Sequence, residues 1–182
     1  MRNTYSNILL IAIAMICMSG CRNAETREIL RGMMGSTIVL PEKITCVQNG
    51  EVFPIPDSLR TGPLLIIYVD SAECNTCRIS HLWEYDELFR ISEETASFDL
   101  IFMMGNTSFE SIPLVRYLSD QDIGHPIYVD EENIFLSSNP FIPQDAKYHS
   151  FLINDRGNPI FVGDPTLSSQ MLEVFKCSLS EL

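Results

Sequence analysis

Two cysteines separated by two residues, Cys74 and Cys77, form the only strong chemical motif in this 182-residue chain. Their spacing allows the two sulfurs to close a disulfide with little movement of the backbone. An apolar run ends at Val69 and a helical pattern begins near the pair, which places the first sulfur at the start of a helix. The unpaired N–H groups at that end of a helix favour a thiolate. Such a pair at a strand–helix junction is typical of reversible dithiol–disulfide chemistry.

Two other uses of the pair stay open from the residues alone. Any two close cysteines can oxidise in an exported protein, so the pair could be a permanent structural disulfide. A zinc site could take Cys74, Cys77 and His81, with Cys46 or His149 as the fourth ligand. The sequence lacks the second cysteine pair that is usual in structural zinc sites. Dithiol chemistry is therefore the favoured interpretation, and no metal is predicted.

The elements on either side of the pair must position it. Residues Leu64 to Val69 form a continuous apolar run, which is typical of a strand buried on both faces. Residues Cys77 to Ile91 show helical spacing of apolar side chains, among them Trp83, which we expect in the core. Further strands are predicted at 37–40, 43–47, 100–104, 126–129, 150–153 and 159–162, and further helices at 112–118 and 167–178.

This order of elements predicts an α/β fold. Strands that alternate with helices imply a largely parallel sheet with helices on both faces, and the last two strands add an antiparallel hairpin. The two short strands at 37–40 and 43–47 would form an N-terminal β-hairpin extension. We therefore predict a mixed central β-sheet flanked by helices, in one domain that covers residues 36–182.

The residues from Leu64 to Phe89 resemble the membrane-tethered thioredoxin-like oxidoreductases of bacterial envelopes, in the redoxin group that includes TlpA-like proteins. The run from Phe151 to Ile160 is similar to the family's apolar strand, acidic turn with glycine and returning strand. The resemblance implies a thioredoxin-like fold over about residues 37–179. It also implies that Cys74 is the nucleophile that attacks a partner disulfide. Cys77 would then be the resolving cysteine that releases the mixed disulfide and closes a Cys74–Cys77 disulfide.

Three positions depart from the usual thioredoxin pattern. Glu73 stands where a tryptophan usually precedes the first cysteine, and Tyr68 stands where a buried acidic residue usually lies. His149 or Ser150 aligns with the usual cis-proline. A carboxylate at Glu73 disfavours a neighbouring thiolate, whereas the guanidinium of Arg78 opposes that effect.

The same alignment makes His149 a candidate site residue. If its imidazole faces the pair, it could stabilise a Cys74 thiolate or move a proton to the leaving Cys77. The alternative is a loop histidine that is held by hydrogen bonds and has no part in the chemistry.

The N-terminus has the features of an export signal. A basic residue, Arg2, precedes an apolar run from Ile8 to Met18, which is too short to span a bilayer. The residues Met18-Ser19-Gly20-Cys21 resemble a bacterial lipobox. The resemblance implies that residues 1–20 are a lipoprotein signal peptide and that Cys21 is lipidated. Residues 21–35 would then be a tether, and the protein would be lipid-anchored in the cell envelope, outside the cytoplasm.

The net charge of the chain argues against one class of function, the binding of nucleic acids. The chain has 24 acidic and 12 basic residues and a formal net charge of −12, so its surface repels phosphate and nucleic-acid binding is not expected. The sequence has no glycine-rich phosphate loop, and no cofactor is predicted.

We therefore predict a membrane-anchored thiol–disulfide oxidoreductase that acts by dithiol–disulfide exchange at Cys74-Asn75-Thr76-Cys77. Its expected partners are the thiols and disulfides of exported proteins and a membrane electron donor, because the envelope has no free pool of reductant. Two alternatives remain. One is a non-catalytic thioredoxin-fold binding or accessory lipoprotein. The other is a peroxiredoxin-like peroxidase with Cys74 as peroxidatic thiol and Ser71 in place of the usual threonine.

Overall fold

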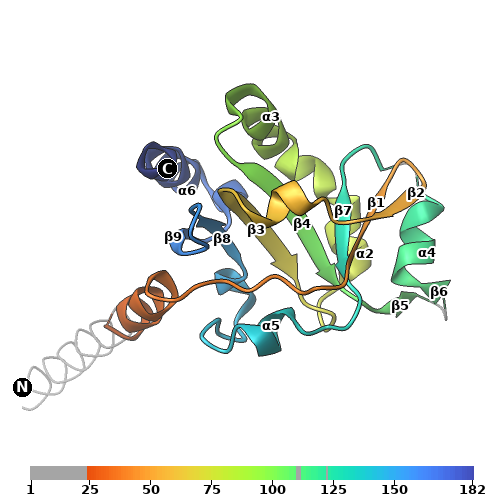
Figure 1. Cartoon of the computed structure of the whole chain (residues 1–182), viewed down its shortest axis with the longest axis horizontal. Helices are drawn as coiled ribbons and strands as arrows, with labels where there is room; N and C mark the ends of the chain where they lie inside the picture. The colour runs from red at the N-terminus through yellow and green to blue at the C-terminus, as the bar shows by residue number, and fades with distance from the viewer. Residues whose placement is uncertain (1–23, 110–111, 122) are drawn as a thin grey trace, which may run out of the picture.

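The computed structural model describes residues 24–109, 112–121 and 123–182, and in this part of the chain seven strands form one mixed sheet (Figure 1). The strand order is β2-β1-β7-β4-β3-β8-β9. The strands are β1 (Ile44–Gln48), β2 (Glu51–Pro54), β3 (Leu64–Val69), β4 (Asp99–Gly105), β7 (Ile127–Asp130), β8 (Ser150–Ile153) and β9 (Pro159–Val162). Strand β4 pairs in parallel with β3 and β7, whereas β8, β9, β1 and β2 pair antiparallel with their neighbours. The predicted mixed sheet is confirmed.

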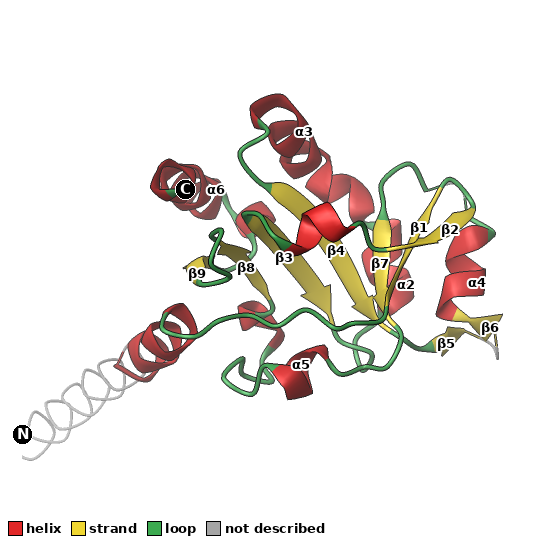
Figure 2. Ribbon diagram, in the orientation of Figure 1, coloured by secondary structure: helices red, strands yellow, loops and turns green. Residues whose placement is uncertain are grey.

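Helices cover both faces of this sheet (Figure 2). They are α2 (Asn75–Ser80), α3 (Asp86–Thr95), α4 (Leu114–Ser119), α5 (Phe135–Ser138) and α6 (Ser169–Ser178). Short 3₁₀ helices lie at η1 (Asp57–Arg60), η2 (Leu82–Tyr85), η3 (Ala146–Tyr148), η4 (Pro165–Leu167) and η5 (Leu179–Glu181). A separate two-stranded ribbon consists of β5 (Ser108–Phe109) and β6 (Ile112–Pro113).

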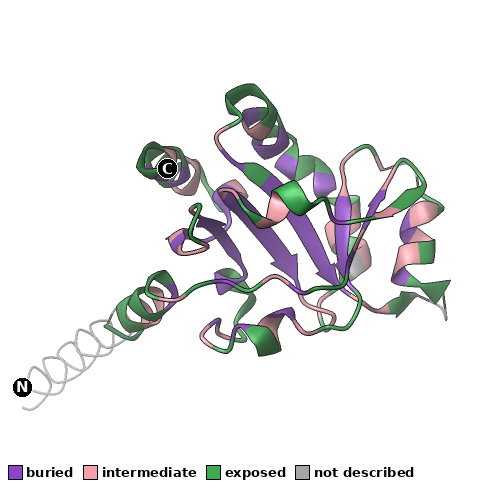
Figure 3. Ribbon diagram, in the orientation of Figure 1, coloured by how far each residue is buried: buried purple, intermediate pink, exposed green. Residues whose placement is uncertain are grey.

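The alternation of side chains in β3 divides the core into two clusters. Leu65, Ile67 and Val69 pack with side chains of α3, α4 and α6 on one face. Leu64, Ile66 and Tyr68 pack on the other face, with side chains of α5 and η3. All six residues of β3 are buried, as the purple central strands in Figure 3 illustrate. Because both faces are covered, the strand reads as one unbroken apolar run in the sequence.

The predicted N-terminal hairpin exists, but its strands differ from the expected ones. Strand β1 pairs with β2 through a turn in which Asn49 and Gly50 both have positive φ angles, 51° and 78°. This turn type matches the twist of a two-residue hairpin. Residues 37–40, which were expected as a strand, have no regular structure. The buried amide of Asn139 takes the place of a neighbouring strand there, because its side chain bonds both the N–H and the C=O of Val39.

The helix expected over Cys77–Ile91 is divided in two. Helix α2 ends at Ser80, η2 follows from Leu82, and α3 begins at Asp86. A 3₁₀ segment has three residues per turn, so Leu82 and Tyr85 lie on one face and are buried. Trp83 lies between them in the sequence and is 65% exposed. The expectation that Trp83 belongs to the core is therefore wrong.

The N-terminal end of the described chain is helical over residues 24–34, and Met33 near its end is fully buried in the second core cluster. Within the described residues, no helix is long and apolar enough to cross a membrane. The expected signal peptide and the expected lipidation site at Cys21 lie outside the described residues.

Candidate redox site

The cysteine pair lies at the junction between β3 and α2. Cys74 is the residue that precedes the first turn of α2, and Cys77 lies within that helix. The two sulfurs are joined in a disulfide of 2.10 Å, with the Cα atoms 5.3 Å apart. Both cysteines are exposed, and the Cys74 sulfur also lies 3.6 Å from the Thr76 hydroxyl. A disulfide in this position can be reached from solvent by another thiol.

The loop between β3 and Cys74 is fixed by its own hydrogen bonds and by β4. The side chain of Asp70 accepts from the N–H of Ala72, and the backbone carbonyl of Asp70 accepts from the N–H of Glu73. The end of β4 approaches this loop at Gly105, where an added Cβ would lie 2.7 Å from the Ser71 nitrogen. A side chain at Gly105 would therefore push the loop away from its place.

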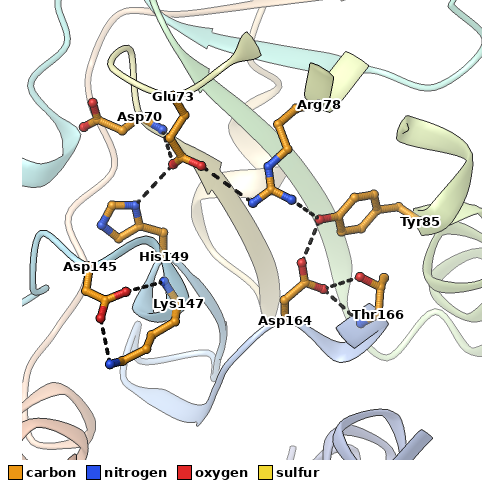
Figure 4. Close-up of polar contacts among 9 residues, drawn as sticks. All are labelled: Asp70, Glu73, Arg78, Tyr85, Asp145, Lys147, His149, Asp164 and Thr166. Atoms are coloured by element: carbon orange, nitrogen blue, oxygen red, sulfur yellow. Dashed lines mark hydrogen bonds and ion pairs between the residues drawn. The ribbon is translucent and has the colours of Figure 1, made fainter. Parts of the chain in front are cut away.

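Glu73, the residue before Cys74, contacts two basic side chains (Figure 4). One oxygen, Oε1, accepts from the N–H of Asp70 at 3.0 Å and lies 3.8 Å from Nδ1 of His149. The other oxygen, Oε2, lies 3.7 Å from the guanidinium of Arg78. The Glu73 side chain is only 24% exposed, so these interactions are partly shielded from water. The structure thus brings Arg78 and His149 together around Glu73, which directly precedes Cys74.

His149 lies immediately before β8 and is 2% exposed. Its Nε2 is 2.9 Å from the carbonyl of Pro143. A carbonyl can only accept, so Nε2 carries a proton. The other ring nitrogen, Nδ1, is buried, has no hydrogen-bond partner among the described residues, and faces Glu73. His149 therefore contacts Glu73, the residue that directly precedes Cys74 in the sequence.

A second polar chain runs from Arg78 through Tyr85 to Asp164, which lies between β9 and η4. The Arg78 guanidinium donates to the Tyr85 hydroxyl at 3.3 Å, and this hydroxyl donates to Asp164 at 2.7 Å. Asp164 is buried and also accepts from the backbone N–H and the hydroxyl of Thr166. Burial, followed by the carboxylate of Asp164, raises the pKa of Tyr85 well above its ordinary value. The hydroxyl therefore keeps its proton and can donate to Asp164.

Tyr68 occupies the strand position where an acidic residue was expected in the resembled family. It is buried in β3, with its ring 5.8 Å from that of His149 and 4.7 Å from that of Phe135. Burial, followed by the charges of nearby carboxylates, raises its pKa above the ordinary value. Tyr68 thus remains neutral beside the site. The usual cis-proline of the resembled family has no counterpart in this structure, because no peptide bond among the described residues is cis.

The other candidate ligands lie apart from the pair. His81 pairs with Glu84 on the surface after α2. Cys46 is buried and Cys177 is exposed, and both are free thiols. No group of three or more His, Cys, Asp or Glu side chains in the described part of the chain could hold a metal ion.

Sequence reasoning missed Tyr85 and Asp164. Tyr85 fits the apolar pattern of a core aromatic, so its hydroxyl gave no signal. Asp164 precedes Pro165 and caps η4 by accepting from the N–H of Thr166. An Asp-Pro-Thr sequence is a recognisable start of a helical turn, but nothing in it indicates a partner 79 residues earlier.

Comparisons with known proteins find similarity of structure only. No family model and no curated protein sequence matches the chain. A secreted disulfide oxidoreductase of Mycobacterium tuberculosis is 13% identical, with a TM-score of 0.43 over 76% of this chain and 95% of its own. A thioredoxin-family thiol:disulfide interchange protein of Chlorobium tepidum is 17% identical, with a TM-score of 0.48 over 76% of this chain and 95% of its own.

The chain's own topology decides its fold. Strands β3, β4 and β7 run parallel, β8 and β9 form an antiparallel hairpin at one edge, and a Cys-x-x-Cys pair follows β3 directly. Helices cover both faces (Figure 2). This arrangement is the thioredoxin-like fold, as the sequence predicted.

Proposed function

We propose that this protein is a membrane-anchored thiol–disulfide oxidoreductase that exchanges dithiols and disulfides with exported proteins. The observation that carries the proposal is the exposed Cys74–Cys77 pair at the β3–α2 junction. A disulfide with a sequence separation of 3 closes a very short loop and contributes little chain-entropy stabilisation, in contrast to disulfides that close long loops. An exposed bond of small structural value favours a chemical role over a structural one.

The proposed reaction conserves atoms and electrons. In the reduced protein, the Cys74 thiolate attacks one sulfur of a partner disulfide, and the other partner sulfur leaves as a thiolate that takes a proton. Cys77, after losing its proton, attacks the Cys74 sulfur of the mixed disulfide, and the second partner sulfur leaves. The partner gains two electrons and two protons, and the Cys74–Cys77 disulfide is formed.

The Glu73–His149 pair supports a role in moving those protons. Nδ1 of His149 and Oε1 of Glu73 are both acceptors when His149 is neutral and Glu73 is ionised, and two facing acceptors repel one another. One proton shared between them removes that repulsion. We therefore assign His149 to tuning the Cys74 thiol and to proton transfer, through Glu73.

The proposed localisation and partners rest on the export signal at the N-terminus. A lipid anchor at Cys21 would hold the domain at a membrane outside the cytoplasm, and a membrane donor would return electrons to the pair. A globomycin-sensitive shift in the size of the protein in cells, absent in a Cys21→Ala variant, is the expected sign of such processing.

A redox titration of the full chain tests the proposal. The chain is equilibrated with dithiol–disulfide buffers of set potential, its thiols are trapped by alkylation, and the traps are counted by mass. We expect reversible titration within the range of known oxidoreductases, about −270 to −120 mV. Cys77→Ser should leave a rapidly alkylated Cys74, and Cys74→Ser should leave a slower Cys77. A pair that stays oxidised below about −300 mV would be a structural disulfide and would contradict the proposal.

A further inference from the structure

One large aromatic residue that follows the cysteine pair in the sequence lies mostly outside the core. Trp83 is the only tryptophan of the chain and is 65% exposed, although neighbouring Leu82 and Tyr85 are buried. Exposure of so much apolar area is unfavourable in water unless another molecule covers it. The position of Trp83 matters because its side chain lines a groove together with other apolar side chains.

Trp83 lines a groove between two segments that are far apart in the sequence. Its apolar lining comes from Trp83 and Leu88 in the η2–α3 region and from Pro165 and Leu172 in the η4–α6 region. The cavity, which we call the Trp83 groove, has a volume of about 350 Å³. That volume lies at the lower end of the range for sites that hold small ligands or single large side chains.

The charge of the groove restricts its occupant. Glu84 and Glu87 belong to its lining, and none of the described residues that line it is basic. His81 contacts Glu84 and Arg90 contacts Glu87, but neither base belongs to the lining of the groove. The whole protein carries a formal net charge of −12. An apolar group flanked by positive charge is therefore the complementary occupant.

The groove lies within reach of a polypeptide that reacts at the cysteine pair. Trp83 follows Cys74, the sulfur that forms the mixed disulfide, by nine positions, which corresponds to at most roughly 14–18 Å of helical rise. An extended chain covers that distance with about four or five residues. The chain of contacts from Arg78 through Tyr85 and Asp164 to Thr166, which lines the groove, also fixes the groove wall relative to the site (Figure 4).

From these observations we infer that the Trp83 groove binds the substrate polypeptide, through a bulky apolar side chain that lies about four or five residues from the reacting cysteine and is flanked by lysine or arginine. The inference rests on the proposed function and names the substrate class of that same site. Substrates without this feature would still react at Cys74, but with a higher KM.

Peptide binding to a redox-inactive protein tests the groove separately from the chemistry. The Cys74→Ser/Cys77→Ser variant of the full chain is titrated with three peptides of equal length, and Trp83 fluorescence is followed. One peptide has a phenylalanine between two lysines, the second has alanine in place of phenylalanine, and the third has glutamates in place of the lysines. We expect the first peptide to bind saturably and to shift the Trp83 emission to the blue. The other two peptides should bind at least about tenfold more weakly.

Two matched substitutions in α6 locate the binding. Ser169 lines the groove, whereas its neighbour Gln170 does not. Ser169→Arg in the redox-inactive background should weaken the first peptide at least tenfold, because it adds bulk and positive charge to the groove. Gln170→Arg should leave the dissociation constant unchanged, since it adds the same charge outside the groove. Equal effects of the two substitutions would overturn the inference.

Other outcomes also decide the question. Equal affinity for all three peptides, or no saturable change with any of them, would overturn the inference. So would a blue shift without peptide that grows with protein concentration together with dimer formation in sedimentation velocity, because the occupant would then be a second copy of the chain. Exchange of the unsubstituted protein with a small aromatic disulfide is measured in parallel. If the unsubstituted protein shows no such exchange, the proposed function is contradicted. If exchange occurs but peptides do not bind, only the inference about the Trp83 groove is contradicted.

Discussion

Nδ1 of His149 faces Oε1 of Glu73 at 3.8 Å, while Nε2 of the same ring is held by the Pro143 carbonyl. The ring is 2% exposed, so water cannot replace the missing partner of Nδ1 without entering the core. This geometry ties the residue before β8 to the residue before the first cysteine. We therefore expect substitution of Glu73 and substitution of His149 to have opposite effects on the reactivity of Cys74.

The first prediction concerns the pH dependence of Cys74 alkylation in the Cys77→Ser background. Glu73→Gln removes a negative charge beside the thiolate, so the pH of half-maximal rate should fall. His149→Gln keeps a donor for Pro143 but leaves the charge of Glu73 without a shared proton, so this pH should rise. Each shift should be a few tenths to about one unit. Iodoacetamide kinetics from pH 5 to 10 measure both.

The double variant and a surface histidine provide the controls for that experiment. In the Glu73→Gln background, His149→Gln should have little further effect if the two residues act as one unit. His81→Gln, which removes an exposed imidazole paired with Glu84, should not move the profile. Additive shifts of Glu73→Gln and His149→Gln would contradict the coupling.

A second prediction concerns the buried hydroxyl of Tyr85. Tyr85→Phe removes the donor to Asp164 and the acceptor of Arg78, and it leaves a buried carboxylate with fewer hydrogen bonds. We expect the free energy of unfolding to fall by about 1–3 kcal/mol in urea denaturation. Tyr148→Phe is the comparison, because the ring of Tyr148 lies beside the exposed amine of Lys147. Equal losses of unfolding free energy from both substitutions would show that the hydrogen bond to Asp164 adds no extra stability.

A third prediction tests how β4 supports the loop between β3 and Cys74. Gly105→Ala places a Cβ 2.7 Å from the Ser71 nitrogen and 3.1 Å from the Ser71 Cβ. Since backbone must move to relieve this contact, we expect a loss of about 1–3 kcal/mol in unfolding free energy and a changed alkylation rate of reduced Cys74. Gly62→Ala has no heavy atom within 4 Å of the new Cβ and should change neither. An unaltered Cys74 rate in Gly105→Ala would contradict the link between β4 and the site.

A fourth prediction separates the two free thiols of the described chain. Burial raises the pKa of Cys46 to about 11, because the charged thiolate is disfavoured in the core of β1. At pH 8 iodoacetamide should therefore modify the exposed Cys177 and spare Cys46 in the native protein. Peptide mass mapping identifies the modified residues, and both should react in 6 M guanidinium chloride. Equal native rates would mean that β1 opens readily.

A fifth prediction concerns the segment that was expected to be a strand. The Asn139 amide donates to the carbonyls of Val39 and Phe135 and accepts from the N–H of Val39. Asn139→Asp keeps the acceptor but removes both donors and buries a charge, so it should destabilise the protein more than Asn139→Ala does. Urea denaturation at pH 7 measures the difference. If Asn139→Asp is the milder change at pH 7, the side chain does not bind the carbonyls as described.

The positions of the strands were readable from the sequence where burial was complete. Residues Leu64–Val69 are apolar without interruption because both faces of β3 are covered, and the sequence predicted that strand with its observed ends. The segment at 37–40 has equally β-rich residues, but Asn139 satisfies its backbone in place of a strand. Local propensity does not contain a partner that lies 100 residues away.

The sequence by itself determined the cysteine pair, the strand that precedes it and the order of elements that makes the fold thioredoxin-like. Those features depend on local spacing and on the period of the apolar residues, both of which can be read from a short stretch of sequence. Only the tertiary structure decided that Glu73 faces both His149 and Arg78, that Tyr85 meets Asp164, and that Trp83 lies on the surface. Contacts between distant residues and the turn of a 3₁₀ segment arise when the sheet closes and the helices pack, so no local pattern encodes them.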